Sequence, residues 1–596
     1  MAVVSPPFRK VLVANRGEIA IRIFRSLREL GVGSVAVYSE ADRDALHVRA
    51  ADEAYLVGPG PAAESYLVVE RLLDAAERSG AEAIHPGYGF LSENAAFARA
   101  VEGSGLTWIG PPSSAIELMG SKTEARTAMR KAGVPIIPGT TEPVTTFEEV
   151  VRLGDEIGYP LIIKAAAGGG GKGMKLVYEP GEAQRAFESA QREGEKFFAD
   201  GRVYVERYLE NPRHVEVQVL ADGHGNVIHL GERDCTIQRR HQKLIEETPS
   251  PAVDEELRAR IGGIAVDAAR AAGYRSAGTI EGLLTADGSY YFMEMNTRIQ
   301  VEHTVTEEVT GIDLVREQVL IAAGAELSVR QEDVVLRGHA IECRINAEDV
   351  GSGFLPAPGR ITLYEEPTGP GVRVDSGVTA GSEITGLYDP MIAKLIVRGS
   401  DREHARRRML RALEDFRIGG PPTLVGFHRA LLEHPCFVAG ETCEGLVESD
   451  ELAARAAELA AEQDLRADAA PAVGAGRLRE RVRAVEVGGR RYEVTLLEPE
   501  PPWAELARRR RERAKGAGGG AGSAAIVSPM QGTVLKVEVA DGDAVEAGQV
   551  VAVVEAMKME NEITAHRAGV VSGLAVAPGA AVSSGQTICL VEADAE

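Results

Sequence analysis

The sequence predicts a multidomain protein in which α/β and α+β domains precede a small, flattened all-β sandwich. Three observations support this fold class. With 596 residues, the chain is longer than one hydrophobic core usually organises, so roughly three to five domains are expected. Its opening residues alternate strand, helix and strand, which indicates an open parallel sheet. Its last segment repeats internally in short strands broken at glycines, which is typical of a two-layered sandwich.

The first domain is predicted at residues 1–120. Its opening pattern of strand, amphipathic helix and strand covers residues 10–15, 18–30 and 34–38. Such a βαβ unit starts an open parallel sheet. A second α/β stretch follows and carries the sequence HPGYGFLSEN at residues 85–94.

Four further segments separate the first domain from the last. Residues 121–330 mix hairpin signals with one glycine run, and residues 331–450 have the pattern of a smaller α+β domain. Residues 451–514 contain an Ala-rich helix, a loose spacer and a hairpin signal at Gly488-Gly489. Residues 515–525 are rich in Gly and Ala, which predicts a flexible tether.

The last domain, residues 526–594, repeats at an offset of 37 residues, and Gly532 aligns with Gly569 in this repeat. The connection between the halves reads AMKMEN, so Lys558 falls at a turn between them. An isolated lysine is ordinarily a solvated surface residue, but this position presents its amine to a modifying enzyme. The segment resembles the biotinyl domains of biotin-dependent enzymes, whose lysine carries biotin through an amide bond. In the related lipoyl domains the lysine usually follows Asp rather than Met.

Composition and charge argue against several classes of protein. No apolar run approaches the roughly 18 residues of a membrane span, and the first residues lack the features of a secretory signal. The net charge of −23 argues against nucleic-acid or membrane partners, because phosphate binding needs a basic face. We therefore expect a cytoplasmic protein. Its five cysteines, without CxxC or metal-ligand spacing, are predicted to be reduced thiols.

A glycine run at residues 168–171 follows an apolar segment that ends at Lys164, and Lys172 and Gly173 come next. Successive glycines let backbone N–H groups approach a polyphosphate, and lysines add positive charge. The run is not a P-loop, because it lacks the G-x-x-x-x-G-K-[ST] order. Its place between two strand-like segments favours a lid over a nucleotide, with a flexible linker as the alternative.

Glu281 and Glu294 flank a hairpin signal at Asp287-Gly288. A two-residue loop there places the two glutamates opposite each other, with Cβ atoms about 5 Å apart. Like charges at that distance repel, and a divalent cation would remove the penalty. Carboxylates and nucleotide phosphates are ligands that Mg²⁺ prefers, so we predict a metal site to which Asn296 also contributes.

The next residues, RIQVEH, place Arg298, Gln300 and Glu302 on one side of an extended segment. A cation, an amide and a potential base on one side suit a small oxyanion. Residues 232–243 add a basic strip, within which Cys235 is expected to be an interior thiol rather than a nucleophile.

Together these motifs resemble the biotin carboxylase family of the ATP-grasp superfamily, over about residues 10–438. NRGEIA, HPGYGFLSEN, GGGGKGM, ERYLENPRHVEVQ, ERDCTIQRRHQK, MEMNTRIQVEH and ECRINAED stand here as that family has them. The resemblance implies a biotin carboxylase N-terminal domain at 1–120, an ATP-grasp domain at 121–330 and a C-terminal domain at 331–450.

The resemblance also implies a role for each candidate residue. ATP would be bound by Lys122, Lys164, Gly168, Gly169, Gly170, Gly171, Gly173, Glu206, Leu209, His214, Gln238 and His241. Mg²⁺, or Mn²⁺ in its place, would be held by Glu281, Glu294 and Asn296. Bicarbonate would be held by Arg298, Gln300 and Val301, and the catalytic residues would be Glu302 as base with Arg344, Arg298 and Lys243.

The implied reaction carboxylates the chain's own biotin with ATP and bicarbonate, by way of carboxyphosphate. Nothing in the sequence suggests an acyl-CoA site, so a separate carboxyltransferase β subunit is the expected partner, alongside a biotin protein ligase and further copies of this chain. The acyl-CoA would be acetyl- or propionyl-CoA or a relative, with a branched methylcrotonyl type as the alternative. Larger α subunits of this kind insert a docking domain, for which residues 451–514 are too short. The hairpin there could be its remnant. Two competing hypotheses for the whole chain are a lipoyl-bearing ATP-grasp ligase and an inactive biotin scaffold.

Overall fold

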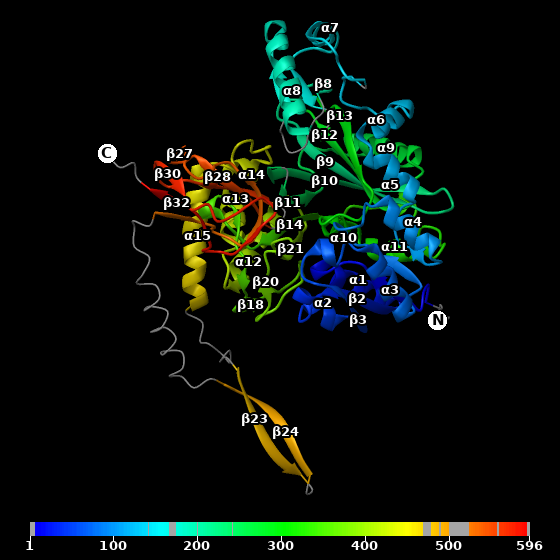
Figure 1. The fold of residues 1–596 in the computed structure, drawn as a ribbon. Helices are drawn as coiled ribbons and strands as arrows, with labels where there is room; N and C mark the ends of the chain where they lie inside the picture. Colours follow the sequence, from blue (N-terminus) through cyan, green and yellow to red (C-terminus); the bar gives the residue numbers. More distant parts are fainter. Residues whose placement is uncertain are drawn as a thin grey trace. The chain divides into compact units, whose positions relative to one another are not determined.

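We describe the protein from a computed structural model. It describes residues 6–140, 142–165, 174–198, 201–240, 242–468, 478–487, 490–499, 524–556 and 559–592. The chain divides into two compact units, Met1–Gln463 and Asp464–Glu596, which are considered separately (Figure 1).

The first unit opens with a five-stranded parallel sheet in the order β3-β2-β1-β4-β5. Its strands are β1 (Lys10–Val13), β2 (Gly33–Ser39), β3 (Glu53–Gly58), β4 (Ala83–His85) and β5 (Thr107–Trp108). The helices along it are α1 (Gly17–Glu29), α2 (Leu46–Ala50), α3 (Val69–Ser79), α4 (Ala95–Gly103) and α5 (Ser113–Gly120). Every strand pair is parallel, which confirms the predicted open parallel sheet. Buried Val, Leu and Ile side chains form cores on both faces of this sheet.

An eight-stranded sheet in the order β13-β12-β9-β10-β11-β14-β21-β19 forms the centre of the first unit. Its strands are β9 (Arg213–Ala221), β10 (Val227–Arg239), β11 (Gln242–Thr248), β12 (Ser276–Leu284), β13 (Tyr290–Asn296), β14 (His339–Asn346), β19 (Val372–Ser376) and β21 (Met391–Gly399). All its strand pairs are antiparallel. In β9 the valines at 215, 217 and 219 join a core with helix α9 (Glu255–Ala271). The polar residues between them therefore face the other side of the sheet.

A smaller three-stranded sheet, in the order β7-β6-β8, lies next along the chain. It consists of β6 (Leu161–Ala165), β7 (Met174–Val177) and β8 (Val203–Arg207), with α6 (Lys122–Lys131), α7 (Phe147–Ile157) and α8 (Ala183–Phe198) as neighbouring helices in sequence. The predicted glycine run falls between β6 and β7, which pair antiparallel. The glycines themselves, residues 168–171 and 173, lie outside the described residues.

The hairpin of β12 and β13 pairs Glu281 with Glu294, as predicted, but its loop differs from the prediction. The turn has three residues rather than two: Gly288 N–H donates to the Thr285 carbonyl at 2.9 Å, and Gly288 has a positive φ of 81°. This is the type I turn followed by a left-handed residue that closes three-residue hairpins. The shift of register is reversed by a β-bulge between Glu281 and Gly282 in the ladder, which leaves Met293 as the extra residue.

The remaining helices of the first unit are α10 (His303–Thr310), α11 (Leu314–Ala322), α12 (Arg402–Asp415), α13 (Val425–Glu433) and α14 (Pro435–Ala439). Helix α15 (Asp450–Asp468) confirms the Ala-rich helix predicted after residue 450 and continues into the second unit. The short strands are β15 (Glu348–Asp349), β16 (Leu355–Pro356), β17 (Gly359–Arg360), β18 (Leu363–Glu365), β20 (Glu383–Ile384) and β22 (Arg417–Gly419).

The expectation that all five cysteines are reduced is wrong for two of them. Cys436 and Cys443 form a disulfide, with Cα atoms 5.7 Å apart. Helix α14 ends at Ala439, and the C-cap Gly440, with a φ of +74°, turns the chain back and brings the two side chains together. A spacing of seven residues without a recognised motif does not reveal such a reversal. Cys235, Cys343 and Cys589 are free and buried, so the prediction that Cys235 is an interior thiol is confirmed.

The second unit contains a hairpin and a sandwich. Strands β23 (Leu478–Val487) and β24 (Arg490–Pro499) pair with Val487 opposite Arg490, which confirms the hairpin predicted around residues 488 and 489. The sandwich has two four-stranded sheets, β25-β32-β30-β27 and β29-β28-β26-β31. Its strands are β25 (Ala525–Val527), β26 (Gly532–Val537), β27 (Ala544–Val545), β28 (Val550–Ala556), β29 (Met559–Thr564), β30 (Gly569–Ser572), β31 (Ala581–Val582) and β32 (Thr587–Glu592).

The predicted repeat is confirmed strand by strand. β26, β27 and β28 begin at residues 532, 544 and 550, and β30, β31 and β32 begin 37 residues later at 569, 581 and 587. Each equivalent pair is divided between the two sheets, and one apolar core lies between them. Gly532 and Gly569 are equivalent in detail, because a Cβ at either would meet the carbonyl oxygen of Glu555 or Glu592 at 2.3 or 2.2 Å.

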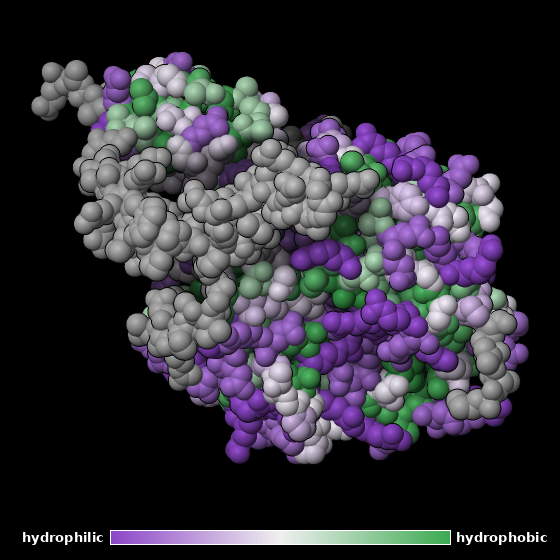
Figure 2. Space-filling view, turned by 90° about the horizontal axis from the view of Figure 1, so that it is seen from below, coloured by the Kyte–Doolittle hydropathy of each residue, from purple (hydrophilic) through white to green (hydrophobic). Residues whose placement is uncertain are grey.

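Hydrophilic residues predominate on the face in Figure 2, and hydrophobic ones are scattered over it. Within the described residues, no helix combines the length and apolar character that crossing a bilayer requires.

The hairpin turn generates a stability prediction. Gly288→Ala places a Cβ on a left-handed residue, so we expect a loss of about 1–2 kcal/mol in the free energy of unfolding. The matched control is Gly263→Ala in α9, an exposed helical position where an added Cβ meets nothing within 4 Å. That substitution should raise stability by about 0.5–1 kcal/mol. Chemical denaturation of both variants measures the two effects, and equal effects would contradict the assigned turn.

Candidate functional site

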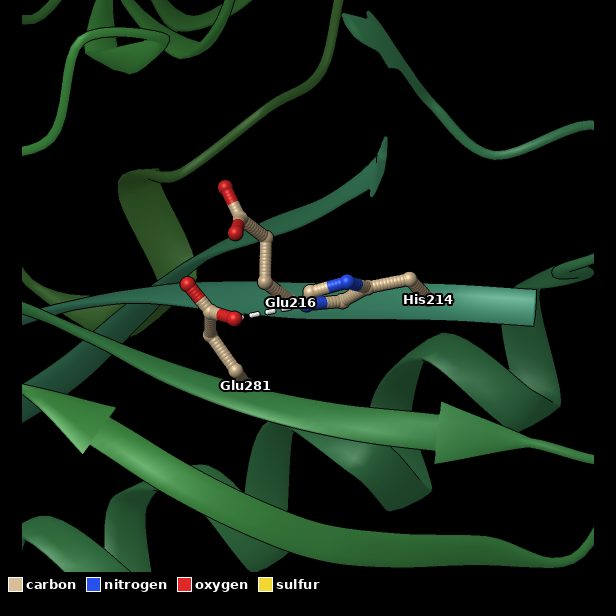
Figure 3. A group of neighbouring side chains, drawn as sticks. All are labelled: His214, Glu216 and Glu281. Carbon is tan, nitrogen blue, oxygen red and sulfur yellow. Dashed lines mark ion pairs between the residues drawn. The ribbon is translucent and has the colours of Figure 1, made fainter. Parts of the chain in front are cut away.

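The candidate site lies on the polar face of the eight-stranded sheet. Alternation in β9 places His214 and Glu216 on the face opposite the α9 core. Glu281 of β12 is the ladder partner of Glu216 and points to the same side (Figure 3). Possible ligand atoms of these three side chains lie within 4.8 Å of one another. The site therefore gathers on adjacent strands residues that are far apart in sequence.

Lys243 at the start of β11 joins three buried carboxylates. Its Nζ lies 2.6 Å from Glu216, 2.9 Å from Glu281 and 2.7 Å from Glu302. Burial opposes the charged form, but these carboxylates raise the pKa of Lys243 well above its usual range. Lys243 is therefore a fixed ammonium ion, and it cannot act as a base at neutral pH.

Arg233 of β10 is fully buried behind Lys243 and uses all five of its N–H donors. Nε donates to Glu216 at 2.5 Å, and the two terminal nitrogens donate to four further acceptors. These acceptors are the side-chain oxygens of Gln218 (2.8 Å), Thr306 (3.0 Å), Thr279 (3.1 Å) and Gln300 (2.6 Å). Within the basic strip at residues 232–243, β10 thus turns Arg233 into the interior.

The two glutamates predicted to share a metal differ in their surroundings. Glu281 is buried, lies 2.7 Å from His214, and accepts hydrogen bonds of 2.6 Å from both Asn296 and Gln300. Although burial opposes ionisation, Lys243 holds the pKa of Glu281 far below its usual range. Within the described part of the chain Glu294 has no hydrogen-bond or ion-pair partner. Its side chain is exposed at the surface, yet desolvation by the surrounding protein and the charge of Glu281 raise its pKa.

This arrangement has the donor set that Mg²⁺ requires. Glu281 and Glu294 are ladder partners, and Asn296 lies beside them through its bond to Glu281. Carboxylate and amide oxygens are the ligands of hard divalent cations. A cation would offset the repulsion that raises the pKa of Glu294. The residues present therefore fit the predicted metal.

The segment after β13 was predicted to be extended through Glu302, and this is wrong at its end. Residues 301 and 302 form a turn, and α10 begins at His303 with Glu302 as its N-cap. The turn keeps the predicted side chains together all the same, because Gln300 reaches Glu281 and Glu302 reaches Lys243. Strand alternation could not reveal that the chain bends there.

Arg298 and Val301 complete this segment. The Arg298 guanidinium donates to Glu93 at 3.0 Å and to the Asn296 side-chain oxygen at 2.8 Å. The Val301 carbonyl accepts a 2.9 Å hydrogen bond from the buried ammonium group of Lys394.

Arg344 of β14 contacts the turn from the neighbouring strand. Its Nε donates to Glu246 at 2.7 Å and its terminal nitrogen to Glu302 at 2.9 Å. Glu302 is thus held between two cations, Lys243 and Arg344. Burial opposes its ionisation, yet these cations hold the pKa of Glu302 well below its usual range.

The residues predicted to bind nucleotide lie on two sheets. Lys164 of β6 donates to Glu206 of β8 at 2.5 Å, and Leu209 follows β8 as a buried side chain. On the central sheet the Gln238 amide lies 2.7 Å from His214 Nδ1. Lys122 is exposed at the start of α6. His241, Gly168, Gly169, Gly170, Gly171, Gly173 and the predicted biotin attachment residue Lys558 lie outside the described residues.

Sequence reasoning missed four charged residues that hold the site together. Glu216 and Arg233 form the buried pair behind Lys243, Glu246 holds Arg344, and Arg126 donates to Glu206 at 2.5 Å. An available signal was the run HVEVQVLA in β9, where a glutamate stands among residues of a strand that is buried on both faces. A charge in such a strand requires a partner.

Family models match the chain in four places. They are "Biotin carboxylase, N-terminal domain" at residues 7–116, "Carbamoyl-phosphate synthase L chain, ATP binding domain" at 121–330, "Biotin carboxylase C-terminal domain" at 342–449 and "Biotin-requiring enzyme" at 524–594.

One known protein matches this chain over almost its whole length, and others match its front three-quarters. The biotin-dependent acyl-coenzyme A carboxylase alpha3 subunit of Mycobacterium leprae is 46% identical over 96% of both chains. A pyruvate carboxylase subunit of Methanothermobacter thermautotrophicus is 56% identical over 73% of this chain and 88% of its own. Among solved structures, the biotin carboxylase domain of Hydrogenobacter thermophilus 2-oxoglutarate carboxylase, in complex with MgADP, ADP and bicarbonate, is 49% identical. The match covers 75% of this chain and 98% of that domain, with a TM-score of 0.69.

The asymmetry between the two glutamates predicts opposite effects of removing their charges. In metal-free protein, Glu294→Gln should leave the free energy of unfolding equal to or above that of the wild type, because it removes a like charge beside Glu281. Glu281→Gln should cost about 1.5–3 kcal/mol, because it weakens charged hydrogen bonds to a buried carboxylate. Denaturation in the presence of a chelator measures both. Equal destabilisation by the two substitutions would contradict the predicted repulsion.

Proposed function

Because the chain belongs to the biotin carboxylase family and carries a biotinyl domain behind its carboxylase domains, we propose that it carboxylates biotin on its own Lys558 and passes the carboxyl group to a separate carboxyltransferase that acts on an acyl-CoA. The observation that carries this proposal is the 46% identity to an acyl-CoA carboxylase alpha subunit over 96% of the chain. That similarity includes the segment between carboxylase and carrier. Acetyl- or propionyl-CoA is the proposed acceptor class, and a branched methylcrotonyl-type acyl-CoA is the alternative.

ATP is bound between the small sheet and the central sheet in this proposal. Lys122 and Lys164 meet its phosphates, and the glycines at 168–171 and 173 close over them. Glu206, Leu209, His214, Gln238 and His241 line the nucleotide. Mg²⁺ held by Glu281, Glu294 and Asn296 supplies positive charge to the phosphate oxygens. Electrostatic stabilisation of this kind is the main contribution of proteins to phosphoryl transfer.

Bicarbonate lies against Arg298, Gln300 and Val301, with Glu302 as its base. The γ-phosphoryl group passes from ATP to a bicarbonate oxygen, ADP leaves, and the carboxyphosphate formed breaks down to phosphate and CO₂. Glu302 starts as a weak base, because Lys243 and Arg344 hold its pKa low. When Arg344 turns from Glu302 toward biotin, that cation no longer stabilises the carboxylate. The pKa of Glu302 then rises, and Glu302 becomes a stronger base.

When bound, biotin would supply the ureido nitrogen that accepts the carboxyl group, and the phosphate released from carboxyphosphate would take the proton of that nitrogen. Arg344 stabilises the negative oxygen of the deprotonated ureido group in this proposal: Glu246 anchors its Nε, and the terminal nitrogen that donates to Glu302 is released toward biotin. Lys243 holds the carboxylates around it in place. The partners in this proposal are a carboxyltransferase β subunit, a biotin protein ligase and further copies of the chain, and the proposed location is the cytoplasm.

A carboxyltransferase that acts on an oxo acid is the second candidate partner. The pyruvate and 2-oxoglutarate carboxylases above are similar to this chain over its front three-quarters. Mixing the biotinylated chain with acyl-CoA carboxyltransferase subunits and a panel of acyl-CoAs, beside pyruvate and 2-oxoglutarate carboxyltransferases with their own substrates, decides between the two. Carboxylation of an oxo acid alone would overturn the proposed acceptor.

Attachment of biotin to Lys558 is directly measurable. After expression with a biotin ligase, intact-mass analysis should show the addition of a single biotin, which Lys558→Arg abolishes. Lys536→Arg, in the other half of the repeat, is the control and should leave the addition in place. Biotin on a second lysine in the Lys558→Arg variant would contradict the assignment.

Glu302 and Arg344 bond each other at the turn, but their substitutions should affect the two half-reactions differently. Glu302→Gln is expected to lower bicarbonate-dependent ATP cleavage by about 10²–10⁴-fold, the usual contribution of a general base. Arg344→Ala should lower carboxylation of free biotin more than it lowers ATP cleavage. Assays of both half-reactions on each variant test this. Equal losses in the Arg344 variant would show that it acts before biotin enters.

A further inference from the structure

Two buried carboxylates face each other beside Arg344. Glu246 of β11 and Glu342 of β14 are ladder partners in an antiparallel pair, and both are fully buried. Directly opposed residues have Cβ atoms about 5 Å apart, so their carboxyl groups come within reach of each other. Two ionised carboxylates at that distance in the interior would be strongly unfavourable.

Each of these carboxyl groups has one oxygen engaged and one oxygen unpartnered. Glu246 Oε1 accepts from Arg344, and Glu342 Oε2 accepts from the Thr304 hydroxyl. Glu246 Oε2 and Glu342 Oε1 are buried and have no hydrogen-bond partner within the described part of the chain. Buried carboxyl oxygens are almost always satisfied. A proton between these two oxygens would satisfy both with one hydrogen bond.

Charged groups from four elements surround the pair. The cations are Arg344 on β14, Lys394 on β21 and Lys243 on β11, and the anion is Glu302 at the start of α10. Burial raises the pKa of both carboxyl groups, of Glu246 to about 8 and of Glu342 to about 7. Arg344 opposes the rise at Glu246, and the charge of Glu342 adds to it. Lys394, which also lies 3.4 Å from Glu18, opposes the rise at Glu342.

We propose that Glu246 and Glu342 share one proton at neutral pH and that this proton keeps Arg344 electrostatically available to an anionic substrate group. With one proton the pair carries a single negative charge, so Arg344 and Lys394 together outweigh it. Without the proton, the pair carries two negative charges, and Glu246 competes with the anionic substrate group for Arg344. Glu342 is thus a positioning residue that acts through Glu246. The inference rests on the proposed role of Arg344.

The sign of the pH dependence follows from the raised pKa values. The folded state binds the proton more tightly than the unfolded chain, so its contribution to stability is present at low pH and is lost as pH rises through about 8. The availability of Arg344 should decline over the same range. Above that pKa the protonated fraction falls about tenfold for each pH unit, so carboxylation of free biotin should fall roughly tenfold between pH 7 and pH 9.

Infrared spectroscopy of the full-length protein tests the proton directly. The wild type should show the carbonyl band of a protonated carboxylic acid at pH 7, and this band should weaken at pH 9. In Glu342→Gln the band should be absent from the difference spectrum, because an amide replaces the group that shares the proton. Glu317→Gln is the control, since Glu317 is also buried but bonds Ser328 elsewhere in the unit. If the wild type shows no such band that titrates, the shared proton is contradicted. The test therefore does not depend on whether the variant folds.

The pH profile tests the link to Arg344. Glu342→Gln leaves Glu246 as the one charge of the pair, so the ratio of free-biotin carboxylation at pH 9 to that at pH 7 should rise about tenfold relative to the wild type. Glu317→Gln should keep the wild-type ratio. A titrating band with an unchanged ratio in Glu342→Gln would overturn the link to Arg344. A wild-type protein with the band but without carboxylation of free biotin would count against the proposed function instead.

Discussion

The site depends on a single ammonium group held by three carboxylates. Lys243 contacts Glu216 of β9, Glu281 of β12 and Glu302 at the start of α10, and these three residues come from separate segments of the chain. Each carboxylate would be costly to bury alone. Because the three carboxylates share one cation, the strands and the turn can be brought together at one point. Arg233 holds Glu216 in place through a further hydrogen bond. The part of the network that contains His214 and the part that contains Arg344 meet at Lys243.

This constraint explains why the central sheet is polar on one face and apolar on the other. In β9, valines pack against α9 while His214, Glu216 and Gln218 face the charged network. The same strands therefore contribute apolar side chains to the core on one face and charged side chains to the site on the other. Its antiparallel ladder also aligns opposing carboxylates twice, at Glu281 with Glu294 and at Glu246 with Glu342. The first pair is the proposed cation site, and the second is closed off from solvent.

Much of this could be read from the sequence, in unequal measure. Strand periodicity and the glycine positions predict the parallel sheet, both hairpins and the 37-residue repeat, because these features depend on local pattern. The pairing of Glu281 with Glu294 was predicted correctly although the assumed loop was one residue too short, since the bulge at Met293 reverses the shift. The turn at Val301 was missed because strand alternation gives no sign of the bend, and the disulfide was missed because a spacing of seven residues does not reveal the reversal at Gly440. Partners of buried charges, such as Glu246 for Arg344, have no signature in sequence spacing.

The division of the repeat between two sheets has a mechanical consequence. The chain enters the sandwich through β25, which pairs with β32, whereas the connection that carries residue 558 joins β28 and β29 in the other sheet. A force transmitted from the preceding chain therefore acts first on the hydrogen bonds between β25 and β32. The β28–β29 hairpin takes no part in those hydrogen bonds. The force reaches this hairpin through the chain that leads from β25 into β26, through the β26–β28 ladder and through the apolar core between the layers. Two ladders, β26–β28 and β28–β29, therefore lie between the strand where the load enters this layer and the strand that follows residue 558.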